Sequence, residues 1–135
     1  MSTIEWQPAY DVQVSRFDEQ HKKLFQLMSD LHNAMKEGEG QIKLAEIFNA
    51  LTAYTTTHFS DEISLMESMN YPGTAEHKAQ HDNLIMQVGE LNKKFVKGDG
   101  VVSIEVLNFL KNWLVTHIQH EDKKYGLFFN SKGIY

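Results

Sequence analysis

Five of the seven histidines in this sequence fall on the apolar faces of its predicted helices. They are His21, His58, His77, His81 and His117. A single histidine on such a face is more often a hydrogen-bonded core residue than a ligand. Five of them on four helices are different, because each unsatisfied buried ring would cost about 1–3 kcal/mol. One shared metal centre would satisfy all five.

The spacing of the possible ligands supports a metal site. His58 and Glu62 are four residues apart, as are His77 and His81, so each pair lies on one face of its helix. Either spacing is common by chance, but the two together on facing helices indicate a shared centre. The chain has no cysteine, which excludes disulfides, thiolate zinc sites and iron–sulfur clusters. Any metal must therefore be held by histidine and carboxylate.

The composition excludes several other classes of protein. An apolar fraction of 41% and a charged fraction of 23% in 135 residues are typical of one globular domain, spanning 1–135. No apolar run approaches the roughly 18 residues of a membrane helix, and the N-terminus lacks a signal-peptide pattern, so we expect a cytoplasmic protein. A net charge of −5 without a basic block argues against nucleic acid or a membrane surface as partner.

The apolar periodicity predicts an all-α protein, an antiparallel up-down-up-down four-helix bundle. We expect an extended N-terminal arm, a first helix capped by Asp18, and a short C-terminal tail with too much Gly and Lys for a long helix. In this topology all five histidines reach the same end of the bundle. The expected helices span 18–37, 41–69, 74–96 and 103–122.

Four segments carry a resemblance to a known family. They are FDEQH at 17–21, HFSDE at 58–62, HKAQH at 77–81 and WLVTHIQHED at 113–122. With the Trp-containing arm before them, they resemble the hemerythrin family over nearly the whole chain, and its single-domain bacterial members in particular. The resemblance implies a non-haem di-iron centre that binds dioxygen reversibly.

The same resemblance implies a role for each ligand and two iron ions as the cofactor. The two irons would be bridged by two carboxylates and a solvent-derived oxo or hydroxo group. The first would be coordinatively complete, and the second would keep one position open for O2. The implied ligands are His77, His81 and His117 for the first iron, His21 and His58 for the second, and Glu62 and Asp122 as the bridges.

Asp122 would not follow from helical spacing alone. Glu121 lies four residues after His117 and shares its face, whereas Asp122 lies five residues after it. The family pattern selects Asp122, so we expect either a carboxylate that reaches sideways or a local widening of the helix. His120 and His32 match no ligand position, and we expect both to be solvated or to play a supporting role.

The sequence predicts the residues around the metal ligands less specifically than it predicts the ligands. Phe59 beside His58 is one candidate for a dry oxygen pocket, although ordinary core packing explains it equally well. Tyr125, soon after Asp122, is a candidate for contact with a ligand. The remaining pocket candidates, with the same alternative, are Trp113, Leu114 and Ile118.

The resulting functional hypothesis is an oxygen-binding protein, not an enzyme, that transports, stores or supplies O2. A histidine-rich ligand set should favour reversible binding over cleavage of the O–O bond. An oxygen or redox sensor, an iron-handling protein, and a di-iron peroxidase or oxidase stay open as alternatives. The expected partners are dioxygen and an O2-consuming recipient protein. The mixed-charge outer faces predict a monomer.

Overall fold

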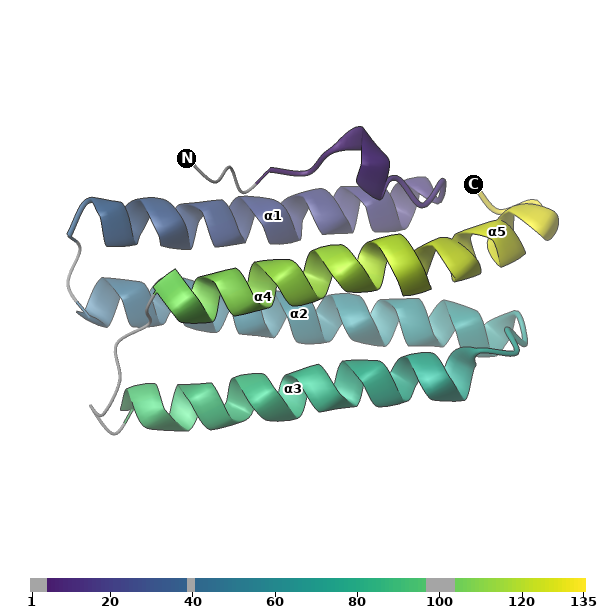
Figure 1. Cartoon of the computed structure of the whole chain (residues 1–135). Coiled ribbons are helices and arrows are strands. Elements are labelled where there is room, and N and C mark those ends of the chain that lie inside the picture. The colour runs from purple at the N-terminus through teal and green to yellow at the C-terminus, as the bar shows by residue number, and fades with distance from the viewer. Residues whose placement is uncertain (1–4, 39–40, 97–103) are drawn as a thin grey trace.

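Four long helices lie side by side and alternate in direction (Figure 1). The computed structural model describes residues 5–38, 41–96 and 104–135. The predicted all-α bundle is confirmed; the predicted start of its fourth helix at residue 103 lies outside the described residues. Among the described residues, no helix combines the length and apolar composition that a membrane crossing requires. The helices are α1 (Ser15–Lys36), α2 (Gln41–Ser68), α3 (Thr74–Val96) and α4 (Ile104–His117).

The bundle core follows the apolar stripes of the helices. On α1, Leu24, Met28 and Leu31 recur at steps of four and three, and all three side chains are buried. This spacing keeps them on one face of the helix, which packs against α2 and α4. The outward face carries polar side chains, among them the ion pair of Lys22 with Glu19. Burial of the inward face therefore orients α1 and the histidine it carries.

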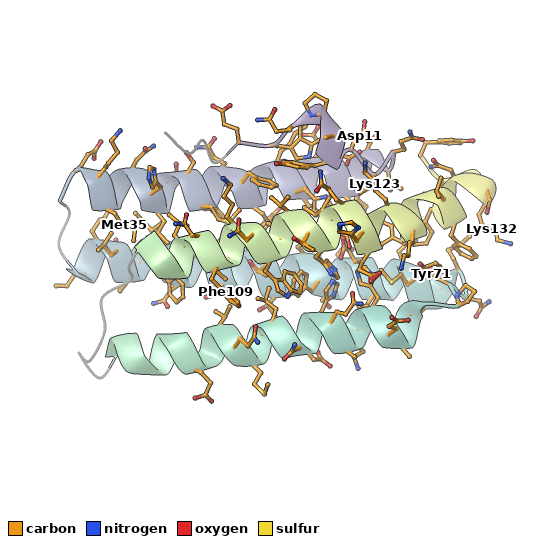
Figure 2. All side chains as sticks on the ribbon, in the orientation of Figure 1. Asp11, Met35, Tyr71, Phe109, Lys123 and Lys132 are labelled. Atoms are coloured by element: carbon orange, nitrogen blue, oxygen red, sulfur yellow. The ribbon has the colours of Figure 1, made fainter. Side chains whose placement is uncertain are left out.

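The C-terminal tail forms a short helix that docks on the bundle through aromatic side chains. After α4 the chain forms a π-helical segment, η2 (Ile118–Asp122), and then α5 (Lys123–Ser131). Tyr125 and Phe129, four residues apart on α5, are both fully buried. Tyr71 lies between α2 and α3, close to the end of the chain (Figure 2). Its ring packs against Phe128 and Phe129, with centroids 5.1 and 6.4 Å apart. Tertiary packing of these aromatic rings outweighs the low helix propensity of glycine.

The N-terminal arm is bound to the bundle by Asp18. A short 3₁₀ turn, η1 (Pro8–Tyr10), precedes Val12 and Val14, which are buried. Helix α1 begins at Ser15, so the prediction that Asp18 is the N-cap was wrong. The Asp18 carboxylate lies inside the first turn and accepts a hydrogen bond from the Val12 N–H at 2.9 Å. Asp18 therefore does accept a hydrogen bond from a backbone N–H near the start of the helix. That N–H belongs to Val12 in the arm and not to the first turn of α1.

Substitution of Gly126 tests the docking of the arm. A Cβ at position 126 would clash with the Val12 carbonyl oxygen, whereas one at Gly89, on α3, would meet nothing within 4 Å. We expect Gly126→Ala to lower the free energy of unfolding by about 1–3 kcal/mol, because backbone must move. Gly89→Ala should leave it unchanged or raise it by up to about 1 kcal/mol. Chemical denaturation of both variants measures the difference; equal stabilities would contradict the close approach.

Candidate metal centre

The seven side chains predicted as ligands come together at one level of the bundle. Each is at most 5% exposed. Every long helix contributes at least one, and the π-helical segment supplies the last. Their positions are His21 on α1, His58 and Glu62 on α2, His77 and His81 on α3, His117 on α4, and Asp122 on η2.

Glu62 is contacted by imidazoles from three helices. The Nε2 atoms of His58 and His21 lie 3.1 and 3.3 Å from its Oε2 atom. The Nε2 atoms of His81 and His77 lie 3.2 and 3.6 Å from its Oε1 atom. This single carboxylate therefore links α1, α2 and α3.

Asp122 occupies the matching place on the other side of the cluster. His77 and His117 each place Nε2 3.1 Å from its Oδ1 atom, and His21 Nε2 lies 3.1 Å from Oδ2. The widening that the sequence left as one of two possibilities is the π-helical segment that begins after His117. Hydrogen bonding from i to i+5 adds a residue to the turn, which brings Asp122 over His117.

The π-helical segment also turns Glu121 away from the cluster. Its Oε1 atom accepts a hydrogen bond from Gln80 Nε2 at 3.0 Å, and Lys124 Nζ lies 3.1 Å from its other oxygen. Glu121 is only partly buried, whereas Asp122 is 1% exposed. Simple helical spacing would have favoured Glu121.

The ligand atoms form two groups that share Glu62. One group contains Glu62, His77, His81, His117 and Asp122, and the other contains His21, His58 and Glu62; within each, the ligand atoms lie within 4.8 Å of one another. His21 also contacts Asp122, so both carboxylates touch both groups. This arrangement suits two neighbouring metal ions with shared carboxylates.

Hydrogen bonds within the cluster do not satisfy all of its polar atoms, and this is what a site that binds a metal requires. His117 Nε2 lies 3.1 Å from the Nε2 atoms of both His81 and His77, although a neutral imidazole carries only one N–H. Among the described residues, Glu62 Oε1 and Asp122 Oδ1 are buried without a hydrogen bond of good geometry, although imidazole nitrogens lie within 3.2 Å of each. Converging nitrogen lone pairs and unpartnered carboxylate oxygens are the donors that a transition-metal cation requires.

Comparison with known proteins assigns the family. A protein-family model, the hemerythrin HHE cation binding domain, matches residues 12–126. The chain belongs to the hemerythrin family. It is 34% identical over 127 residues to a bacteriohemerythrin of Methylococcus capsulatus, a match that covers 93% of this chain and 96% of the relative. A bacteriohemerythrin of Pseudomonas aeruginosa is 32% identical over 125 residues, covering 93% and 80%.

A solved structure extends the likeness to three dimensions. The chain superposes on the crystal structure of a wild-type hemerythrin with a TM-score of 0.85 and 34% identity. The match covers 93% of this chain and 95% of that one. The bundle and the placement of its helices are therefore those of the hemerythrin fold.

Protons occupy this hemerythrin site in its metal-free form. Burial opposes the charged imidazoles, but hydrogen bonds to Asp122 and Glu62 outweigh it and raise the pKa of His21 and of His77 to about 9. Burial likewise opposes ionised Glu62, yet the nearby imidazoles, His58 first, hold its pKa well below the ordinary value. The two carboxylates are thus ionised and paired with imidazolium, and metal ions must displace these protons.

A chain of hydrogen bonds behind His58 fixes the orientation of its ring. His58 Nδ1–H donates to Gln20 Oε1 at 2.5 Å, which leaves Nε2 free to face Glu62. Gln20 Nε2 donates to Asp61 at 2.7 Å, and Arg16 Nε donates to the same carboxylate at 2.9 Å. Sequence reasoning missed all three supporting residues. Gln20 precedes a ligand within FDEQH, but nothing in the sequence points to its partner 38 positions away.

Tyr125 supports the shared carboxylate from inside the bundle. Its side chain is fully buried, and its hydroxyl donates a hydrogen bond to Glu62 Oε2. Burial and the nearby charges of Asp122 and Glu62 raise the pKa of Tyr125 well above the ordinary value, so the phenol stays a donor. This residue, which the sequence marked only by its nearness to Asp122, holds one Glu62 oxygen in place.

Aromatic rings cover the outer side of the three-histidine group. Phe59 stacks on His81 with centroids 3.6 Å apart and planes 4° apart. Trp113 stacks on His117 at 4.5 Å and 17°. The ring of Phe59 also lies beside His58, with the two centroids 6.0 Å apart. The stacking removes the rings of His81 and His117 from water.

The two aliphatic pocket candidates are also buried. Ile118 is completely buried, and Leu114 is 6% exposed. Leu114 also lines an apolar cavity of about 190 Å³ between the helices, together with Leu24 and Met28. An oxygen pocket formed by these residues and the stacked aromatic rings stays a prediction.

The contact between Gln20 and His58 predicts a loss of metal affinity. Gln20→Ala removes the acceptor that orients His58, so we expect metal binding to weaken by about 10–100-fold. Gln26→Ala is the control, since Gln26 lies on the same helix and bonds only the exposed Asp30 among the contacts found. Competition with a chromophoric chelator for Co²⁺ measures both affinities. Equal affinities in the two variants would contradict the orienting role.

The raised histidine pKa values predict opposite pH dependences with and without metal. In the metal-free protein, protonated His21 and His77 contribute stability that is fully present below the ordinary pKa of 6.5 and is lost as pH rises through about 9. Metal must displace these protons, so its affinity should rise across the same interval, by up to about tenfold per pH unit for each proton. Thermal melts and chelator competition test the two trends; a pH-independent affinity would contradict the proton displacement.

Proposed function

We propose that this chain holds two iron ions at the cluster and binds dioxygen reversibly there, for transport, storage or supply of O2. The observation that carries the proposal is the convergence of five imidazoles and two carboxylates in one buried place, in two groups that share Glu62. Membership of the hemerythrin family supports it, as does the bacteriohemerythrin name of its relatives. The unpartnered carboxylate oxygens support a cation as the natural occupant.

The two groups suggest which residues would hold each ion. Three imidazoles surround one position and two surround the other. Glu62 and Asp122 would be shared, because each contacts imidazoles of both groups. The proposed ligands are His77, His81 and His117 for the first ion and His21 and His58 for the second.

The surrounding residues would keep the site suited to reversible binding. Two ferrous ions held here would supply the electrons that dioxygen needs in order to bind. Gln20 holds His58 with Nε2 facing inward, and Tyr125 holds Glu62 through its Oε2 atom. The rings of Phe59 and Trp113 exclude water from His81 and His117. A dry, oriented site with five neutral donors favours binding and release of O2 over oxidation of a second substrate.

Optical spectroscopy tests the proposal directly. The reduced, iron-loaded protein should contain two irons per chain and develop a charge-transfer band with O2 that disappears on degassing. Irreversible bleaching with turnover of an added reductant would instead support a peroxidase or oxidase. One iron per chain, or a spectrum that does not respond to O2, would overturn the proposal.

Ligand substitutions sharpen the test. His58→Ala and Glu62→Ala should each abolish the reversible band while much of the helix content survives, as circular dichroism would show. His120→Ala is the matched control, because His120 lies three residues from His117 but is exposed and belongs to neither ligand group. It should oxygenate like the unsubstituted chain. Reversible oxygenation that persists in His58→Ala would refute its assigned role.

A further inference from the structure

The metal site is built from two similar halves that are 60 positions apart in the chain. The chain has no evident overall sequence repeat, yet the side chains at the site follow this offset closely. Helices α1 and α2 supply one half, and α3, α4 and η2 supply the other. The matching residues are Gln20 with Gln80, His21 with His81, Asp61 with Glu121, and Glu62 with Asp122.

The contacts across the site match in the same way. His21 Nε2 of the first half lies 3.1 Å from Asp122 of the second. His81 Nε2 of the second half lies 3.2 Å from Glu62 of the first. Each half therefore directs an imidazole to the carboxylate of the other, as a twofold relation requires.

The contacts within each half also correspond. His58 Nε2 lies 3.1 Å from Glu62, four residues later, and His117 Nε2 lies 3.1 Å from Asp122, five residues later. The π-helical segment η2 absorbs the one extra residue. The supporting glutamines correspond as well, because Gln20 and Gln80 donate to the carboxylates 41 positions after them, at 2.7 and 3.0 Å.

Among the proposed ligands, the relation breaks at one position. His77 lies four residues before His81 and contacts both carboxylates. The corresponding residue, four before His21, is Phe17. It is fully buried, with its ring centroid 6.2 Å from that of His58 and 5.4 Å from that of Tyr125. His77 lies beside the same tyrosine, at 5.6 Å.

We infer that Phe17 occupies the place of a sixth imidazole and determines which metal position stays open. Phenylalanine fills a buried place next to His58 with a ring that has no donor atom, so the half with His21 has one nitrogen fewer than the half with His77. The missing nitrogen leaves a coordination position for a small ligand. This inference rests on the proposed two-metal site and adds the residue that makes its halves unequal.

Cobalt(II) provides a probe that does not depend on oxygen. Six-coordinate Co²⁺ absorbs more weakly in the visible range than five-coordinate Co²⁺, and azide reports an open position. The unsubstituted chain with two Co²⁺ ions should bind one azide. Phe17→His should keep two Co²⁺ ions, absorb more weakly and bind none. Phe17→Leu, which is apolar and has no nitrogen, is the control and should still bind one.

A converse substitution, in the half that contains His77, also tests the inference. His77→Phe gives both halves two imidazoles, so the variant should absorb more strongly and bind two azides. If Phe17→His does not fold, this variant decides the matter alone. One azide bound to His77→Phe, or to a folded Phe17→His variant, would overturn the inference. Failure of the unsubstituted chain to take up two metal ions would instead refute the proposed function.

Discussion

Burial of two carboxylates in the middle of a helical bundle is the constraint on which the rest of this structure depends. Glu62 and Asp122 are almost completely removed from water, and an isolated charge in such a place would be costly. Imidazoles compensate for that burial, through the protons of His21 and His77 in the metal-free form and through metal ions in the form that we propose. Because the imidazoles come from all four long helices, compensation at the site also fixes how the helices are placed.

Hydrogen bonds from residues around the cluster also help to keep its buried polar groups in place. Buried ligands retain one orientation only when their remaining polar atoms are satisfied. Gln20 meets this need for His58, and Tyr125 meets it for Glu62. The docking of α5 brings Tyr125 to the site, which gives the helical tail a role in positioning Glu62. The arm packs against α5 at Gly126 and is tied to α1 through Asp18. Segments remote from the ligands thus help to hold them.

The two halves of the site are related by an approximate twofold axis and differ in the number of imidazoles that they contribute. Two equivalent halves would bind two ions alike and leave either both or neither accessible. One apolar ring at position 17 distinguishes the halves without disturbing the crossed contacts of His21 and His81. The π-helical segment does the opposite, since it restores the equivalence of Asp122 and Glu62 despite an extra residue. In the two-metal site that we propose, the difference of one side chain therefore separates an open binding position from a closed pair of ions.

The sequence by itself determined the helices, their inward faces and the identity of the donors, because periodicity and four-residue spacing are properties of a single helix. It also placed the histidines at one end of the bundle, and the family pattern selected Asp122. Only the tertiary structure decided how the chain would direct Asp122 inward, which residue would orient His58, and that the tail would be helical. Those outcomes depend on contacts between residues tens of positions apart. Such contacts follow from the rotation and offset of packed helices, which a one-dimensional pattern does not encode.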